Sequence, residues 1–198
     1  MRRDQAGPEV ATAPLEREGS RAPLRGERVS LRPLALADAT PLWALLAGAE
    51  LGGGLRLLAP VTAEAARELV VELAHTAPDL VLGIAARDDG RLVGLAGLHR
   101  LSDAERQAEL GLLVRGPEER GKGFGVEAVR LLCRHGFESL ELARIWLRVR
   151  ADNAPALRAY ERAGFRLERL LRGKEVRGGE RVDVVVMGLL REEWDAAR

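Results

Sequence analysis

The most informative part of the chain is a glycine-rich segment, Arg120-Gly121-Lys122-Gly123-Phe124-Gly125. It follows residues 107–115, which alternate like a β-strand, and precedes residues 123–138, whose apolar positions fall on one helical stripe. Glycine lets a bound group approach the backbone closely, and the first turn of a helix leaves N–H groups unpaired at the positive end of its dipole. The segment therefore predicts an anion site suited to a pyrophosphate.

Two better-known phosphate-binding patterns fail here at single residues. A P-loop requires Ser or Thr after its Gly-Lys pair, but Gly123 stands at that position. A dinucleotide fingerprint counted from Gly121 requires a third glycine where the chain has Val126, and the preceding strands are expected to be antiparallel. The pattern that remains is Arg-x-x-Gly-x-Gly, formed by Arg120, Gly123 and Gly125, and the alternative is a plain glycine-rich turn.

A second segment, residues 153–165, predicts a short helix with both ends marked. Asn153 is placed to cap it, Pro155 suits its first turn, and Gly164 ends it before Phe165 opens a strand. The helix carries Tyr160, the one tyrosine of the chain. Tyr160 is either a buried aromatic or a proton donor, and Asn153 can act as a cap and a cofactor contact at the same time.

Both segments resemble elements of the GCN5-related N-acetyltransferase (GNAT) superfamily. Arg120 to Gly125 is similar to its coenzyme A loop, and residues 153–165 match its N-x-x-A-x-x-x-Y-x-x-x-G-F element at every defined position. Residues 26–34 and 187–194 look like the opening strand and the close of its RimJ/RimL-like ribosomal-protein-alanine acetyltransferase group. The resemblance implies transfer of an acetyl group from acetyl-CoA to a primary amine, by direct attack in a ternary complex.

The resemblance also implies roles for individual residues. Tyr160 stands where the family has the acid that assists the departing thiolate, since a free thiol has a pKa of about 8.5. Glu109 is the candidate base, with a water relay or an exposed surface glutamate as alternatives, and His99 is a weaker candidate expected at the surface. The expected cofactor contacts are the backbone of Leu113, Val114 and Arg115, the loop residues Arg120, Gly121, Lys122, Gly123, Phe124 and Gly125, and Asn153.

The remaining patterns predict one α/β (α+β) domain over residues 26–195. Strands are expected at residues 29–34, 80–86, 92–98, 107–115, 144–150, 165–171 and 182–190. Helices are expected from Asp38 as N-cap, from Thr62, and over residues 123–138 and 153–163. This order gives a mixed, largely antiparallel sheet flanked by helices, as in the GNAT fold. Residues 1–25 lack apolar periodicity and are expected to be a flexible tail, or the product of a misassigned start.

Composition narrows the class of protein further. The 198 residues are 46% hydrophobic, and 31 basic against 30 acidic residues give a net charge of +1, which offers no case for a nucleic-acid or membrane partner. Cys133 is the only cysteine, so no intrachain disulfide or cysteine-based zinc cluster is expected, and the three histidines lack metal-ligand spacing. Cys133 also lies on a predicted buried stripe, which argues against a covalent intermediate. No metal is expected, and the location is expected to be cytoplasmic.

The sequence leaves the acceptor amine open between a protein N-terminus and a small molecule such as a polyamine or an aminoglycoside. A catalytically silent coenzyme A-binding module is the alternative from another class, and the resemblance suggests a homodimer. Four glutamates can either attract a cationic amine or form a solvated helix face: Glu50, Glu64, Glu68 and Glu72. Four basic residues near the last turn disfavour a polyamine pocket there and suit a dimer surface or phosphate contacts: Arg172, Lys174, Arg177 and Arg181.

Overall fold

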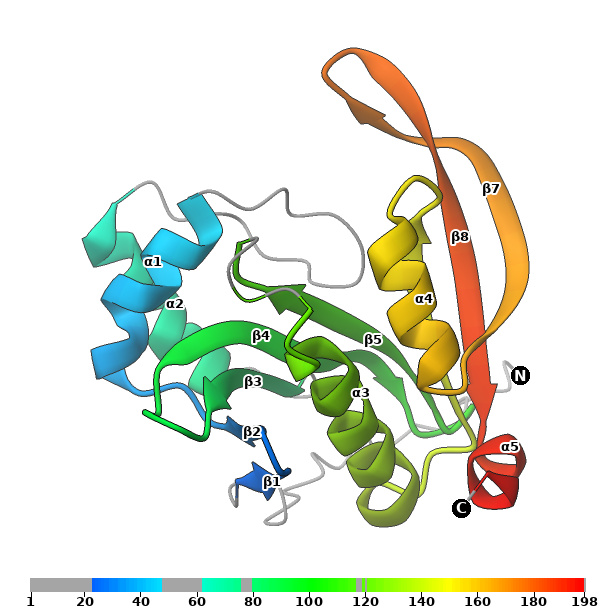
Figure 1. Ribbon diagram of the computed structural model, residues 1–198, viewed down its shortest axis with the longest axis horizontal. Coiled ribbons are helices and arrows are strands. Elements are labelled where there is room, and N and C mark those ends of the chain that lie inside the picture. Colours follow the sequence, from blue (N-terminus) through cyan, green and yellow to red (C-terminus); the bar gives the residue numbers. More distant parts are fainter. Residues whose placement is uncertain (1–22, 48–61, 76–79, 117–118, 120, 198) are drawn as a thin grey trace, which may run out of the picture.

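A computed structural model describes residues 23–47, 62–75, 80–116, 119 and 121–197. These residues form one eight-stranded sheet in the order β1-β2-β3-β4-β5-β6-β8-β7 (Figure 1). All neighbouring strands are antiparallel except β5 and β6, which are parallel. The predicted mixed, largely antiparallel sheet is therefore confirmed. The strands are β1 (Leu24–Arg25), β2 (Val29–Arg32), β3 (Leu80–Ala86), β4 (Leu92–Ser102), β5 (Gln107–Val114), β6 (Arg144–Arg150), β7 (Arg166–Arg177) and β8 (Glu180–Leu190).

Helices cover both faces of the sheet. Helices α1 (Ala39–Ala47) and α2 (Ala63–His75) share one core cluster with Leu92 and Leu95 of β4 and Leu113 of β5. Helices α3 (Phe124–Arg134) and α4 (Ala154–Arg162) pack on the opposite face around Phe137 and Ile145, in the larger core cluster (Figure 1). A 3-10 turn, η2 (Leu36–Asp38), precedes α1, a π-helical turn, η4 (His135–Ser139), follows α3, and α5 (Arg191–Ala196) ends the chain. Among the described residues, no helix combines the length and the apolar character needed to cross a bilayer.

The bounds of β3 and β6 agree with the sequence prediction, whereas the last hairpin is longer than predicted. β7 and β8 reach Arg177 and Glu180, and β7 contains irregularities near Leu167 and Leu171. The two strands pair with each other beyond the core. In that outer part the hairpin has no buried face, so backbone hydrogen bonds between the strands maintain it.

The predicted start of the first helix is wrong in detail. Asp38 is buried and is not an N-cap, because its carboxylate accepts bonds from the backbone N–H of Ala35 at 2.8 Å and from Arg32 Nη1 at 2.6 Å. The helical segment begins three residues earlier, with Ala35 as the N-cap and Asp38 inside the first turn. The predicted start of the second helix at Thr62 is confirmed, since α2 begins at Ala63 and Thr62 Oγ1 accepts a bond from the N–H of Ala65 at 3.1 Å. The three glycines at residues 52–54, which we expect to break the chain between the first two predicted helices, lie outside the described residues.

The parallel pair in the middle of the sheet separates after three residues. Gln107 to Glu109 of β5 pair with Arg144 to Trp146 of β6, and the pairing ends there. β5 remains bonded to β4 as far as Val114, while β6 follows β8 along its whole length. The ends of β5 and β6 therefore diverge and open a slot through the sheet.

Candidate active site

A cleft of about 1020 Å³ occupies the place where β5 and β6 diverge. Its walls come from the ends of these two strands, the glycine-rich loop, α4 and one turn of α1. The cleft is lined by Ala44, Leu45, Leu112, Leu113, Val114, Arg115, Gly116, Glu119, Gly121, Gly123, Phe124, Gly125, Val126, Arg148, Val149, Arg150, Asn153, Pro155, Ala156, Arg158, Ala159, Tyr160, Arg162 and Arg177. It therefore contains the predicted strand backbone, Leu113 to Arg115, and most of the predicted loop.

The glycine-rich loop adopts a backbone that requires glycine. Gly121 and Gly123 have φ values of 78° and 83°, in the left-handed region that other residues rarely adopt. Gly123 precedes α3 as its N-cap without any side-chain cap bond, so the first N–H groups of α3 are left for a ligand at the cleft. Phe124 and Gly125 also line the cleft, as predicted. Arg120 lies outside the described residues.

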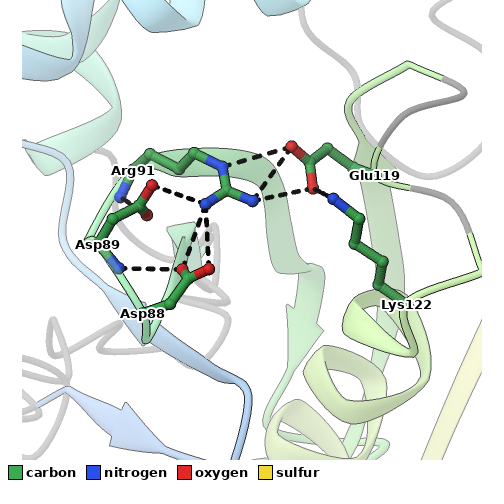
Figure 2. Close-up of polar contacts among 5 residues, drawn as sticks. All are labelled: Asp88, Asp89, Arg91, Glu119 and Lys122. Carbon is green, nitrogen blue, oxygen red and sulfur yellow. Dashed lines mark hydrogen bonds and ion pairs between the residues drawn. The ribbon is translucent and has the colours of Figure 1, made fainter.

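A network of charges fixes this loop to the turn between β3 and β4 (Figure 2). Arg91 Nη2 lies 3.2 Å from Glu119 Oε2, and Arg91 Nη1 lies 2.7 Å from Asp89 Oδ2. Lys122 Nζ also bonds Glu119 Oε2, at 3.0 Å, and Lys122 is not among the described residues that line the cleft. The bonds from Arg91 and Lys122 hold the pKa of the Glu119 carboxyl below its usual range. The Lys122 side chain thus binds another residue of the loop, Glu119, in this structure.

Sequence reasoning missed this anchor. Arg91 and Glu119 are 28 residues apart, and both belong to loops whose charges look like ordinary surface charges in the sequence. Only the pairing of β3 with β4, and of β4 with β5, brings the turn beside the loop. No local signal reports such a contact.

Tyr160 and Asn153 contribute to the cleft from α4. Asn153 Oδ1 accepts a bond from the N–H of Ala156 at 3.3 Å, so the predicted cap is confirmed, and Asn153 also lines the cleft. Tyr160 is 6% exposed and packs edge-on against Phe165, with ring centroids 6.0 Å apart. Burial raises the pKa of Tyr160 to about 12, so the phenol keeps its proton at neutral pH.

The opposite mouth of the slot contains a buried ion pair. Glu109 is fully buried, and its Oε1 accepts a bond from Arg148 Nε at 2.8 Å, while Arg100 Nε lies 3.6 Å from its Oε2. The alternative of an exposed surface glutamate is therefore wrong. His99, which pairs across the strands with Glu109, is buried as well, so its expected surface position is also wrong. Of these four strand residues only Arg148 is among the described residues lining the cleft.

The charge of the cleft wall suits a polyanionic ligand. Six arginines line the described wall, whereas Glu119 is its only acidic residue and is already paired with Arg91 and Lys122. The backbone of residues 112–114 is exposed to the slot because β6 no longer pairs with it. The wall thus offers loop N–H groups and the guanidinium groups of Arg158 and Arg162 on α4 for phosphates, and a strand edge for an amide-containing arm, which fits coenzyme A. The described residues contain no group of three or more potential metal ligands.

Comparison with known proteins identifies the class. The family described as "Acetyltransferase (GNAT) domain" matches residues 28–166, and the chain belongs to this family. The chain is thus an acyltransferase, and enzymes of this family use acetyl-CoA. The predicted superfamily is confirmed, and relatives described as ribosomal acetyltransferases agree with the predicted RimJ/RimL-like group.

Individual relatives place the chain more closely. It is 29% identical to "Uncharacterized N-acetyltransferase p20" of Bacillus licheniformis, over 85% of this chain and 96% of the relative. It is 34% identical to "Putative ribosomal N-acetyltransferase YdaF" of Bacillus subtilis (strain 168), over 56% of this chain and 60% of the relative. It is also 34% identical to "Spermidine N(1)-acetyltransferase" of Escherichia coli (strain K12), over 40% of this chain and 42% of the relative. A solved structure, "Crystal structure of Probable acetyltransferase", superposes with a TM-score of 0.75 at 30% identity, covering 85% of this chain and 96% of the other.

Proposed function

We propose that this enzyme transfers an acetyl group from acetyl-CoA to a primary amine by direct attack in a ternary complex. The observation that carries the proposal is the position of Tyr160 in the wall of the same cleft that the glycine-rich loop and the parted strands form. A single cavity thus combines a pyrophosphate-binding loop, a free strand edge and a buried phenol.

The cofactor-binding roles follow from the chemistry of each wall. The N–H groups at Gly123, Phe124 and Gly125 suit the pyrophosphate, because they begin α3 at the positive end of its dipole. The strand edge from Leu113 to Arg115 suits the amides of the pantetheine arm. Gly121, Lys122 and Arg120 complete the proposed loop, and Lys122 supports it through Glu119.

A hydrogen bond or a proton at the departing sulfur assists the chemical step. Acetyl-CoA supplies a thioester, and its coenzyme A leaves as a thiolate when an amine takes the acetyl group. Tyr160 is the proposed acid, because its phenol remains protonated across the neutral range and lies at the cleft. Cys133 is fully buried and its pKa is raised by burial, which supports direct attack without a covalent enzyme intermediate.

The amine must lose a proton before or during attack, and two routes were expected. Glu109 is fully buried behind Arg148, and among the described residues Arg148 rather than Glu109 reaches the cleft wall. A proton therefore has to travel past Arg148 to reach Glu109. This geometry favours a water relay as the base. Glu109 can accept the proton from this relay only if the chain of waters extends past the Arg148 guanidinium.

The acceptor is proposed to be a protein N-terminus, in line with the relative described as a ribosomal N-acetyltransferase. A small amine is the alternative, in line with the spermidine acetyltransferases. We also propose a cytoplasmic location and a homodimer. The apolar side chains of Leu167 and Leu170, which are exposed on the edge strand β7, support the homodimer.

The test is release of coenzyme A from acetyl-CoA, followed as free thiol, with a panel of peptides with free N-termini, polyamines and aminoglycosides. We expect amine-dependent release with at least one class, and an acetylated product of matching mass. Binding of coenzyme A without release for any amine would favour the catalytically silent module instead.

A further inference from the structure

The slot between β5 and β6 connects two chemically different faces of the sheet. Val149 of β6 and Tyr160 belong to the core cluster on the α3–α4 face, where the glycine-rich loop also lies. Leu113 of β5 packs with α1 on the opposite face, and Ala44 and Leu45 of α1 line the cleft from that side. A cofactor held by the loop leaves this second mouth to the acceptor.

Strand geometry places two arginines at the acceptor mouth. Side chains alternate along a strand, so Arg148 and Arg150 lie on the face opposite to Val149, roughly 7 Å apart along β6. Both line the cleft. The ion pair between Arg148 and Glu109 confirms the face, because Glu109 and Leu113 are also four residues apart on one strand.

Within the described part of the chain, no carboxylate at the acceptor mouth is placed to bind a polyamine. Among the described lining residues the one acid is Glu119, which belongs to the cofactor loop and is held by Arg91 and Lys122. Glu109 stands behind Arg148, and Asp152 is paired with Arg150 at 2.6 Å. A cationic acceptor would thus meet guanidinium groups first.

Arg148 is held in a position to bind an anion. Its one hydrogen-bond partner among the described residues is Glu109, which it contacts through Nε, so both Nη groups are left for a ligand. Its guanidinium also lies 5.9 Å from the ring centre of Trp146, and Arg144 lies 6.0 Å away from the same ring. A buried carboxylate behind the group and an indole beside it limit its rotamers, which lowers the entropy cost of binding a ligand.

We propose that the acceptor carries a carboxylate close to its primary amine, and that Arg148, positioned by Glu109, binds this carboxylate. The proposal rests on the proposed acetyltransferase function and adds the chemical class of its acceptor. Arg148 is the specificity-determining residue, and Glu109 is a positioning residue. The carboxylate can belong to a free amino acid or to an acidic side chain next to a peptide N-terminus.

The test compares matched acceptors that differ only in the anion. One arm uses free amino acids against their amides, and a second uses C-terminally amidated peptides with Glu or Gln at the second position. The amides have the less basic amine and so more free amine at neutral pH, which biases the first arm against the proposal. We expect the anionic member of at least one arm to have a kcat/KM about tenfold higher or more, with spermidine a poor acceptor.

Variants assign the preference to Arg148. Arg148→Gln should lower kcat/KM for the anionic acceptor by about 10- to 100-fold through its KM, leave the neutral partner and the KM for acetyl-CoA nearly unchanged, and be partly rescued by Arg148→Lys. Glu109→Gln should raise the KM for the same acceptor. Arg144→Gln is the control, because Arg144 shares the strand, the face and the Trp146 contact but is not among the residues lining the cleft.

The outcomes separate this inference from the proposed function. If amines release coenzyme A but the wild type prefers neutral or cationic acceptors, or if Arg148→Gln affects both members of a pair equally, the acceptor class is wrong and the function stands. If no amine is acetylated, both fail. The double variant Arg148→Gln, Glu109→Gln removes both charges and replaces Arg148→Gln if the single variant does not fold. The change in tryptophan fluorescence that acceptor binding causes and that Trp146→Phe abolishes gives a binding readout that does not depend on turnover.

Discussion

The titration of Tyr160 provides a quantitative test of its environment. Tyr160 is the only tyrosine of the chain, so tyrosinate absorbance reports this one side chain. Burial raises its pKa from an ordinary value of 10 to about 12. In the unfolded chain the phenol should titrate near pH 10, whereas in the folded chain it should remain protonated until about pH 12.

The same shift predicts a loss of stability in alkali. Because the folded pKa lies above the unfolded pKa, the favourable contribution is complete below pH 10 and is lost as the pH rises through 12. A rise from 10 to about 12 corresponds to about 3 kcal/mol of the free energy of unfolding. Burial also raises the pKa of Cys133, so its ionisation acts in the same direction at still higher pH.

The assay is a rapid jump of the native protein to about pH 11, with absorbance followed at about 295 nm before unfolding begins. With a pKa of about 12, roughly a tenth of Tyr160 should ionise at once and the rest at the rate of unfolding. Tyr160→Phe should show no signal. Immediate ionisation of roughly nine tenths would mean an ordinary pKa of about 10, and would refute the burial of the phenol.

Three further predictions concern the loop and the thiol. Gly121→Ala should cost about 1–2 kcal/mol of stability and raise the KM for acetyl-CoA. Gly90→Ala, at an equally positive φ and with equally open surroundings, should cost the same stability and leave that KM unchanged. The same KM for acetyl-CoA in both variants would contradict the loop's role. Glu119→Gln should raise the KM for acetyl-CoA about three- to tenfold with kcat little changed, because it weakens the pairs with Arg91 and Lys122. The control is Glu64→Gln on the exposed face of α2, which should leave this KM unchanged. A fall in kcat alone would argue against an anchoring function for Glu119. Cys133→Ala should keep its activity, and native Cys133 should resist alkylation, since it is fully buried; loss of activity in a folded variant would reopen a covalent mechanism.

Local signals were sufficient for most of the fold. β3 and β6 were predicted to the residue, because the continuous apolar run of β3 ends at a turn that Gly90 closes, and the alternating run of β6 ends before a helix that Asn153 caps. α4 was predicted because Asn153, Pro155 and Gly164 mark its ends within a dozen residues. These patterns act over a few residues, where propensity and capping determine the backbone.

Contacts between distant residues were not predictable in the same way. Asp38 looked like a helix cap, but Arg32 and Ala35 bind its carboxylate and move the turn toward the N-terminus. Glu109 looked like a strand residue on an open face, because its partner Arg148 lies 39 residues away on a strand whose neighbours the sequence does not reveal. The position of the cofactor loop was predictable, whereas the ion pairs that fix it depend on the order of the strands.

In the proposed mechanism, one cleft both binds acetyl-CoA and supplies the acid for its thioester. The most direct measurement compares the wild type and Tyr160→Phe for coenzyme A affinity, by calorimetry, and for kcat with an accepted amine. Coenzyme A affinity should be unchanged while kcat falls by about 10²- to 10⁴-fold, because the phenylalanine ring preserves the packing against Phe165 and removes only the hydroxyl. An unchanged kcat, or a loss of coenzyme A binding equal to the loss of kcat, would contradict the account.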